Sequence, residues 1–345
     1  MDVKHRTEEQ ERILNLAKWG ECREILEELS ERQLRSFPPA FTSRLLFEVV
    51  PLNTRPAREL AMFVFEHGRW DWREPDDEGM LLHKVLIQNE RVEMAAKAAA
   101  RLRKRDAGNP DLAPVWAELL CYLLEKQQRS AAAAMLNKGV LKYVDEDDLD
   151  EVFRRILSYK DIELLDTVVR STKVIPVELI PVPENLSDYQ FTRELLNRHT
   201  KEIEIKDNEK ILWELAILCE AEVMTERLLK KTKDYQYLPR LAEGSNTLFE
   251  LLLHIRCRDI LDEVKKEVLY GALRSDRWKE RFELLAGKGW KKSSQNHKEA
   301  IRLTDDYLKI LGTKKYAPGR RGHLDQINDR ARLRFIRVYE QKKKL

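Results

Sequence analysis

The sequence predicts an all-α protein built as a solenoid of helical hairpins and followed by a basic helical extension. Two observations support this class: a short apolar motif recurs about every 35 residues, and glycine is scarce. The 345 residues include only 12 glycines, about half the usual frequency, whereas a large α/β protein needs glycines in its strand-to-helix turns. Hydrophobic residues make up 43% of the chain, which is enough to build a sizeable core.

The recurring motif combines two or three apolar residues with a glutamate or another polar residue. Its clearest copies begin near residues 45, 80, 115, 151, 175, 211 and 247, and weaker copies begin near 11 and 267. The clear copies are separated by 35, 35, 36, 24, 36 and 36 residues, so five of the six intervals agree within one residue. In the copy at 175, Pro181 and Pro183 are expected to disturb the first helix. The period predicts one supersecondary unit per copy.

Each unit is expected to hold two short helices and a polar connector. In the copy at 211, residues 212–218 are almost all apolar, and residues 223–229 carry one apolar stripe at helical spacing. Two short helices cannot bury their own apolar faces, so successive units are predicted to stack around one continuous core. The aromatic residues of the motif, Phe47, Trp213 and Phe249, are therefore predicted to be core residues.

One junction between units contains the parts of a known repeat in order. Residues 63–68 form a helix end closed by Gly68, residues 69–75 form a finger, and residues 76–83 form an Asp/Gly turn that leads into Met-Leu-Leu-His. This junction resembles that of ankyrin repeats. The resemblance is degenerate, since the Thr and Pro of the family signature and most interhelical glycines are missing, and it extends over roughly residues 8–290. It implies an ankyrin-like array over residues 1–290 whose fingers and first helices bind other proteins.

The finger after Gly68 contains the candidate protein-binding residues Arg69, Trp70, Trp72 and Arg73. Tryptophan and arginine are enriched among the residues that carry most of the binding energy at protein interfaces. The alternative for each tryptophan is that it packs against the neighbouring repeat.

Known signatures of catalysis and metal binding are absent from the sequence. It has no GxxxxGK[ST] phosphate loop, no HExxH and no GxSxG, and its seven histidines and four cysteines show no metal-ligand spacing. We therefore expect no enzyme activity, no cofactor, no metal and no small-molecule substrate. The widely spaced cysteines, the charged N-terminus and the lack of a long apolar stretch predict an intracellular protein, cytoplasmic or nuclear, that does not enter a membrane.

The charge of the chain is concentrated at its C-terminal end. Residues 288–345 contain 17 Lys and Arg and six acids, a net charge of +11, so the preceding residues carry −8 of the chain's total of +3. The extension at 291–345 is predicted to be helical, with an apolar stripe on one face of its last helix and arginines on another. Its candidate anion- or nucleic-acid-binding residues are Lys314, Lys315, Arg320, Arg321, Arg330, Arg334 and Arg337. The alternative is that these cations pack against the acidic body.

These observations predict a non-enzymatic scaffold or adaptor that binds a protein partner and forms part of a larger intracellular complex. The alternative function is that of a nucleic-acid-associated protein whose basic extension contacts DNA or RNA.

Overall fold

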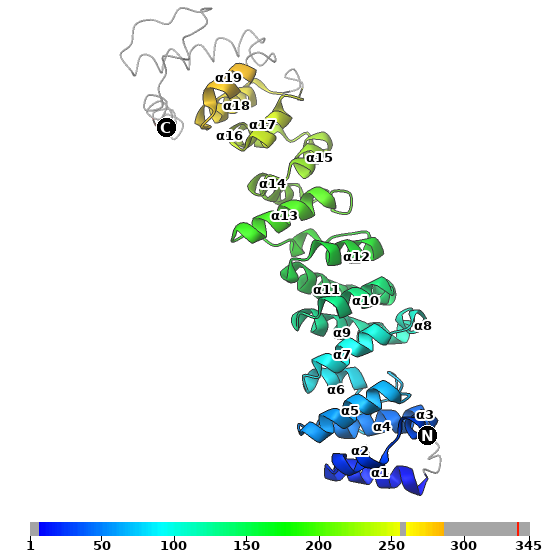
Figure 1. Ribbon diagram of the computed structural model, residues 1–345. Coiled ribbons are helices and arrows are strands. Elements are labelled where there is room, and N and C mark those ends of the chain that lie inside the picture. The colour runs from blue at the N-terminus through cyan, green and yellow to red at the C-terminus, as the bar shows by residue number, and fades with distance from the viewer. Residues whose placement is uncertain (1–6, 256–259, 286–336, 338–345) are drawn as a thin grey trace, which may run out of the picture. The chain divides into compact units, whose positions relative to one another are not determined.

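The computed structural model describes residues 7–255, 260–285 and 337, and these residues form helices, turns and loops without a β-strand among them (Figure 1). The predicted all-α class is therefore confirmed. The chain divides into two compact units, residues 1–179 and 180–345. Of the predicted extension at 291–345, only Arg337 is among the described residues, and the predicted boundary at 290 lies outside them.

In the first unit the helices are α1 (Glu8–Trp19), α2 (Cys22–Glu28), α3 (Glu31–Ser36), α4 (Pro39–Val49), α5 (Arg55–His67), α6 (Leu82–Gln88), α7 (Val92–Arg101), α8 (Lys104–Ala107), α9 (Ala113–Glu125), α10 (Arg129–Asn137), α11 (Glu146–Tyr159) and α12 (Ile162–Thr172), with the 3-10 turns η1 (Pro110–Leu112), η2 (Val140–Tyr143) and η3 (Val177–Leu179). In the second unit they are α13 (Leu186–Arg198), α14 (Glu209–Leu218), α15 (Glu222–Thr232), η4 (Tyr235–Tyr237), α16 (Leu238–Glu243), α17 (Asn246–Leu252), α18 (Asp262–Arg274) and α19 (Trp278–Leu285).

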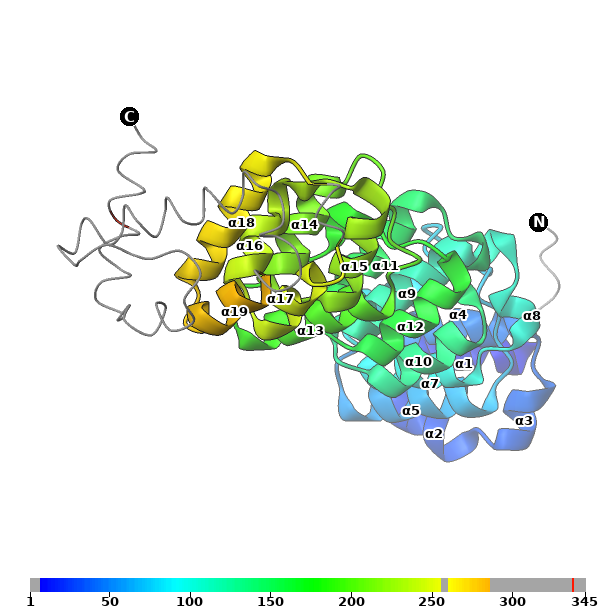
Figure 2. The same cartoon turned by 90° about the horizontal axis from the view of Figure 1, so that it is seen from above.

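The helices of the first unit lie in pairs that contact one another in chain order. The pairs are α1 with α2, α4 with α5, α6 with α7, α9 with α10, and α11 with α12. First helices contact first helices of the next pair, in the order α1, α4, α6, α9 and α11. Figure 2 shows the second helices α2, α5, α7, α10 and α12 one behind another in a second layer. Each pair therefore buries its apolar face against its neighbours.

Polar side chains join the successive pairs of the first unit at intervals close to the sequence period. The Arg91 guanidinium donates to the Val50 carbonyl oxygen at 2.7 and 3.0 Å, across 41 residues. The Lys138 ammonium donates to the Ala100 carbonyl oxygen at 2.7 Å, across 38 residues. The carbonyl groups at the C-terminal ends of helices lack intrahelical hydrogen-bond partners. The Arg91 and Lys138 side chains donate hydrogen bonds to such carbonyl oxygens and so supply the missing partners.

The second unit also has an aromatic core and a cationic side chain that donates a hydrogen bond to a distant backbone carbonyl oxygen. Trp213 on α14 is fully buried and stacks on Tyr237 with ring centroids 4.9 Å apart, and Phe249 on α17 is 3% exposed. The guanidinium of Arg281, on α19, lies 5.0 Å from the centre of the Phe249 ring and donates to the Ala242 carbonyl oxygen, 39 residues away. The two aromatic residues therefore lie in the core, as the motif predicts.

Most of the predicted unit starts fall at or inside helices. Positions 11, 45, 115, 151, 211, 247 and 267 lie within α1, α4, α9, α11, α14, α17 and α18, and position 80 lies two residues before α6. The exception is Ile175, which is buried but lies in a non-helical segment between α12 and η3. Pro176 disfavours the helical conformation at Ile175, and Pro181 and Pro183 follow closely. The copy at 175 therefore does not begin an α-helix, and the next α-helix is α13, which begins at Leu186.

Local capping signals explain where several helices begin. The Thr7 and Ser30 hydroxyls accept from the amides of Gln10 and Gln33, whose side chains accept from the capping residues in return. In the acidic run at 145–148, the Asp145 carboxylate accepts from the Asp148 amide at 2.9 Å and caps α11. Among the described residues, no helix combines the length and the apolar composition that a bilayer span requires.

Replacement of Gly68 by alanine is expected to destabilise the first unit. A Cβ at Gly68 would lie 2.6 Å from the Val64 carbonyl oxygen and closer still to the Thr42 Cγ2. Overpacking of this kind costs about 1–3 kcal/mol, so we expect a lower melting temperature in calorimetry for Gly68→Ala. The control is Gly108→Ala, whose Cβ would meet the Lys104 carbonyl oxygen at an ordinary 3.5 Å. Equal melting temperatures for the two variants would contradict the close approach at Gly68.

Candidate functional site

Hydrogen bonds from Trp70 and Asp71 hold the finger between α5 and α6 to α5 and α4. The Trp70 indole nitrogen donates to the Phe65 carbonyl oxygen at 3.0 Å. The Asp71 amide donates to the hydroxyl of Ser43, a buried residue of α4, at 3.1 Å. The Asp71 carboxylate in turn accepts a hydrogen bond from the Arg73 amide at 3.0 Å. Aspartate side chains often form a local turn of this kind with the backbone amide two residues later. The finger is therefore fixed in place by the rest of the unit.

The two tryptophans of the finger have different environments. Trp72 is only 8% exposed and packs edge-on against Trp116 of α9, with ring centroids 5.2 Å apart. Trp70 is half-buried, stacks on Phe65 with centroids 4.5 Å apart, and meets Trp72 edge-on at 4.8 Å. Trp72 is thus a core residue that ties the finger to the next helical pair, while part of the Trp70 side chain remains accessible.

A pocket of about 400 Å³ lies between the finger and the segment at 101–106. The sequence separates these two segments by about 33 residues, close to one predicted unit. Trp116 holds the second segment, because its indole nitrogen donates to the Asp106 carbonyl oxygen at 3.0 Å. The lining residues are Pro39, Phe65, Gly68, Arg69, Trp70, Asp71, Trp72, Arg73, Ala98, Arg101, Leu102, Arg103, Arg105, Asp106 and Leu112.

Three of the five arginines that line this pocket are engaged with neighbouring groups. Arg101 donates to two carbonyl oxygens at the end of α5, those of Phe65 and Glu66, at 3.2 and 2.9 Å. Arg73 is 3.3 Å from the Asp71 carboxylate, and Arg105 is 3.5 Å from that of Asp106.

The remaining two arginines, Arg69 and Arg103, are exposed and have no ion pair or side-chain hydrogen bond within the described parts of the chain. They come from opposite segments, Arg69 from the finger and Arg103 from the stretch that precedes α8. We call this site, defined by Arg69, Trp70 and Arg103, the Trp70 pocket.

The Trp70 pocket is positively charged. Burial raises the pKa of Asp71, but the hydrogen bonds from the Arg73 amide and guanidinium, together with the charge of Arg73, more than offset this and leave that pKa below its ordinary value. Asp71 is therefore ionised at neutral pH. Five arginines and the two carboxylates of Asp71 and Asp106 give the lining a net charge of +3. An anionic group is the ligand that this field favours.

Of the candidate binding residues named from the sequence, the structure brings together Arg69, Trp70, Trp72 and Arg73 around the Trp70 pocket. The candidates in the extension lie outside the described residues, apart from Arg337, which is an exposed helical position. The sequence reasoning missed Arg101, Arg103 and Arg105. Their signal was present in the basic run at 101–105, one predicted period after the finger.

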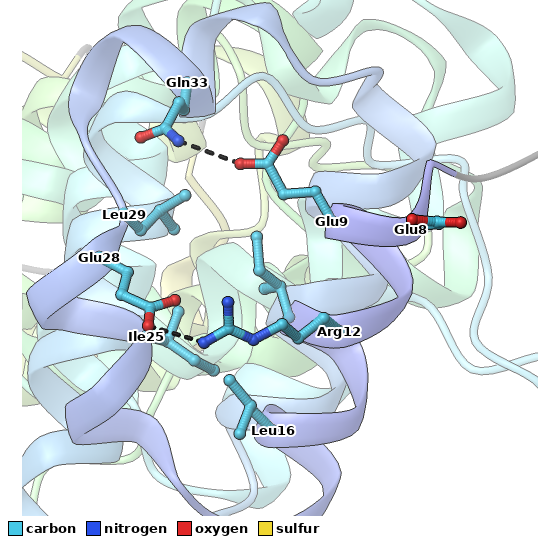
Figure 3. A pocket seen from close by; sticks show the side chains of 9 residues that line it. Glu8, Glu9, Arg12, Leu16, Ile25, Glu28, Leu29 and Gln33 are labelled. Atoms are coloured by element: carbon cyan, nitrogen blue, oxygen red, sulfur yellow. Dashed lines mark hydrogen bonds and ion pairs between the residues drawn. The ribbon is translucent and has the colours of Figure 1, made fainter.

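A second cavity, of about 320 Å³, lies among α1, α2 and α3 at the start of the first unit (Figure 3). Ile25 and Leu29 form part of its apolar floor. Polar side chains bridge its opening: Arg12 reaches across to Glu28 at 2.7 Å, and the Gln33 amide donates to Glu9 at 3.0 Å. Its polar lining groups are thus largely paired with one another, and we place the candidate functional site at the Trp70 pocket.

His83 is a buried residue at the start of α6 that joins two helical pairs. It is 1% exposed, and its Nε2 lies 2.8 Å from the Glu118 carboxylate on α9, to which it donates. Burial lowers the pKa of His83, and the hydrogen bond and charge of Glu118 offset this only in part; nearby Lys84 lowers it further. Within the described ranges, no three His, Cys, Asp or Glu side chains gather in a way that would hold a metal ion.

Comparison of this chain with models of protein families, with characterised proteins and with solved structures found no match.

The buried His83 predicts an acid-sensitive first unit. In the unfolded chain this histidine binds a proton as the pH falls below about 6.5, whereas in the fold it resists protonation to a lower pH. The free energy of unfolding should therefore fall as the pH drops from about 7 to about 5.5, and His83→Gln, which keeps a donor toward Glu118, should show a smaller fall. Urea unfolding at several pH values measures the free energy of unfolding of the wild type and of the variant. The same pH dependence in the two proteins would show that His83 does not cause the acid sensitivity.

Proposed function

We propose that this protein is a non-enzymatic scaffold that binds another protein through the Trp70 pocket. The observation that carries the proposal is a pocket lined by a half-buried tryptophan and by two exposed arginines that have no partner of their own within the described residues. Residues of these two types supply much of the binding energy at protein interfaces. Because the finger and the facing segment are held by hydrogen bonds to α4, α5 and α9, little order has to be gained on binding.

The proposal includes an ankyrin-like array of helical pairs as the framework of the scaffold. Three features of the first unit support it. The helical pairs contact one another in chain order, and side-chain hydrogen bonds join residues 35–41 positions apart. A third is the turn at 76–81, where the Asp76 carboxylate accepts from the Met80 amide at 2.7 Å and Gly79 has φ +82°. An array of this kind presents connectors from successive pairs side by side, which suits recognition of a protein surface.

The chemistry of the pocket favours binding over catalysis. Guanidinium groups stay protonated at physiological pH, so arginines hold anions but do not act as bases. The carboxylate of Asp71 is paired with Arg73 and has a lowered pKa, which makes it a poor general base. The lining residues include no serine, cysteine, histidine or lysine that would act as a nucleophile.

A pocket variant is expected to lose its partner without losing its fold. We expect full-length protein with Arg69→Glu and Arg103→Glu to capture at least about tenfold less of a specific partner in quantitative affinity purification, because charge reversal at a binding hot spot costs more than about 1.4 kcal/mol. The matched control is Arg23→Glu, an exposed residue of α2 whose ion pair among the described residues is with Glu27 on its own helix. Circular dichroism checks that all the variants stay helical. A set of captured proteins that is the same for the wild type and the pocket variant would contradict the proposed function.

The charge of residues 288–345 supports a second candidate function, nucleic-acid binding through the extension. A net charge of +11 over this stretch provides many cations for phosphate contacts, although the chain as a whole is only +3. In this alternative the helical pairs recruit a protein while the extension contacts DNA or RNA.

The second candidate predicts salt-dependent binding to a random oligonucleotide. At about 50 mM salt the full chain should bind, and the affinity should fall steeply by about 200 mM as counterions compete for the phosphates. Substitution of Arg330, Arg334 and Arg337 by glutamate should abolish this binding, whereas Arg23→Glu should not change it. Fluorescence anisotropy measures both. An absence of binding at the lower salt concentration would argue against the nucleic-acid function.

A further inference from the structure

We infer that the ligand of the Trp70 pocket is an acidic peptide segment that places an apolar side chain against Trp70 and carboxylates on Arg69 and Arg103. This inference rests on the proposed function and names the chemistry of the partner. It follows from three properties of the pocket: its charge, the two arginines without partners within the described residues, and the accessible apolar surface of Trp70 and Pro39.

The charge of the pocket is opposite in sign to the net charge of residues 1–287 as a whole. The lining carries +3, whereas residues 1–287 together carry −8. The positive lining attracts an acidic segment at short range, and the net charge of residues 1–287 does not add to that attraction. A partner with a short acidic stretch therefore fits better than one that is acidic over a large area.

Arg69 and Arg103 are the groups available to a ligand. Arg101 is engaged with helix-end carbonyl oxygens, and Arg73 and Arg105 have carboxylates beside them. Arg69 and Arg103 are exposed, belong to the two facing segments, and have no partner within the described residues. A guanidinium binds a carboxylate through two parallel hydrogen bonds, so two such groups suit two carboxylates of one peptide.

The lining also includes some apolar surface. Trp70 is half-buried and Pro39 is exposed, and the indole nitrogen of Trp70 is already bonded to the Phe65 carbonyl oxygen. The accessible part of Trp70 thus offers apolar contact rather than a free donor. A leucine or phenylalanine between the carboxylates of the ligand would cover this surface and remove it from water.

A single-stranded nucleic acid fits the pocket less well than a peptide does. Binding of single strands relies on aromatic rings with open faces and on a groove of cations that follows several phosphates. Here Phe65 stacks on Trp70, Trp72 is buried, and the two available cations lie on either side of one pocket of about 400 Å³. These features favour one or two carboxylates and an apolar side chain.

The test uses the full-length chain and fluorescein-labelled probes in anisotropy titrations. The first probe is an octapeptide with Leu-Phe at its centre, flanked by Asp and Glu. The second replaces every Asp and Glu by Asn and Gln, the third replaces Leu-Phe by Ser-Ser, and the fourth is an oligothymidylate. We expect the acidic apolar peptide to bind about tenfold or more tightly than either peptide control, with an affinity that falls as salt rises from about 50 to about 300 mM.

The protein variants connect this binding to the pocket. Arg69→Gln combined with Arg103→Gln should weaken binding of the first probe about tenfold or more, while Arg23→Gln leaves it unchanged. Equal binding of the acidic and amide peptides, equal binding by the wild type and the double variant, tighter binding of the oligothymidylate, or no binding of the first probe would each overturn the inference.

Failure of the inference is distinguishable from failure of the proposed function. If the peptide result is negative but charge reversal at Arg69 and Arg103 still removes proteins captured by the wild type, the scaffold function stands and only the acidic-segment assignment is wrong. If both results are negative, the Trp70 pocket is not the binding site.

Discussion

The structure of each unit depends on one constraint: the helices are too short to bury their apolar faces within a single pair. In the first unit, α6 contains only residues 82–88, yet Leu82 and Leu86 are fully buried. Besides its partner α7, α6 contacts α4 of the preceding pair and α9 of the following pair. In the first unit α4, α6 and α9 thus each contact the first helix of the pair before and of the pair after, as well as their own partner helix.

Hydrogen bonds from cationic side chains to helix-end carbonyl groups, called polar ties below, fix how one helical pair packs on the next. Apolar faces alone allow pairs to slide, whereas hydrogen bonds to the last carbonyl groups of a helix fix one position along it. Arg91, Arg101 and Lys138 each make such bonds to the preceding helical pair in the first unit, and Arg281 makes one in the second. These bonds span 35–41 residues, so the spacing of the polar ties follows that of the apolar motif.

The helical class and much of the core could be predicted from the sequence because periodicity reports burial directly. Phe47, Trp213 and Phe249 are buried at 7%, 0% and 3% exposure, as their place in the motif predicts. The site was harder to predict. The sequence alone does not distinguish the burial of Trp70 from that of Trp72, because both lie in the finger. Trp72 is the more buried of the two because it packs against Trp116, which lies 44 residues later in the sequence. The arginines at 101–105 could have been predicted as part of the site only by using the period of about 35 residues to place them beside the finger.

The residues in and around the Trp70 pocket divide between those that hold the fold and those that are exposed to solvent. Phe65, Trp72 and Trp116 are buried. Arg101 is bonded to the end of α5, so changing any of these four residues would disturb both the stack and the pocket. Arg69 and Arg103 are exposed and take part in none of these contacts, so their chemistry can change at little cost in stability. The exposed charges of the pocket can therefore change while the buried residues that hold its framework stay the same.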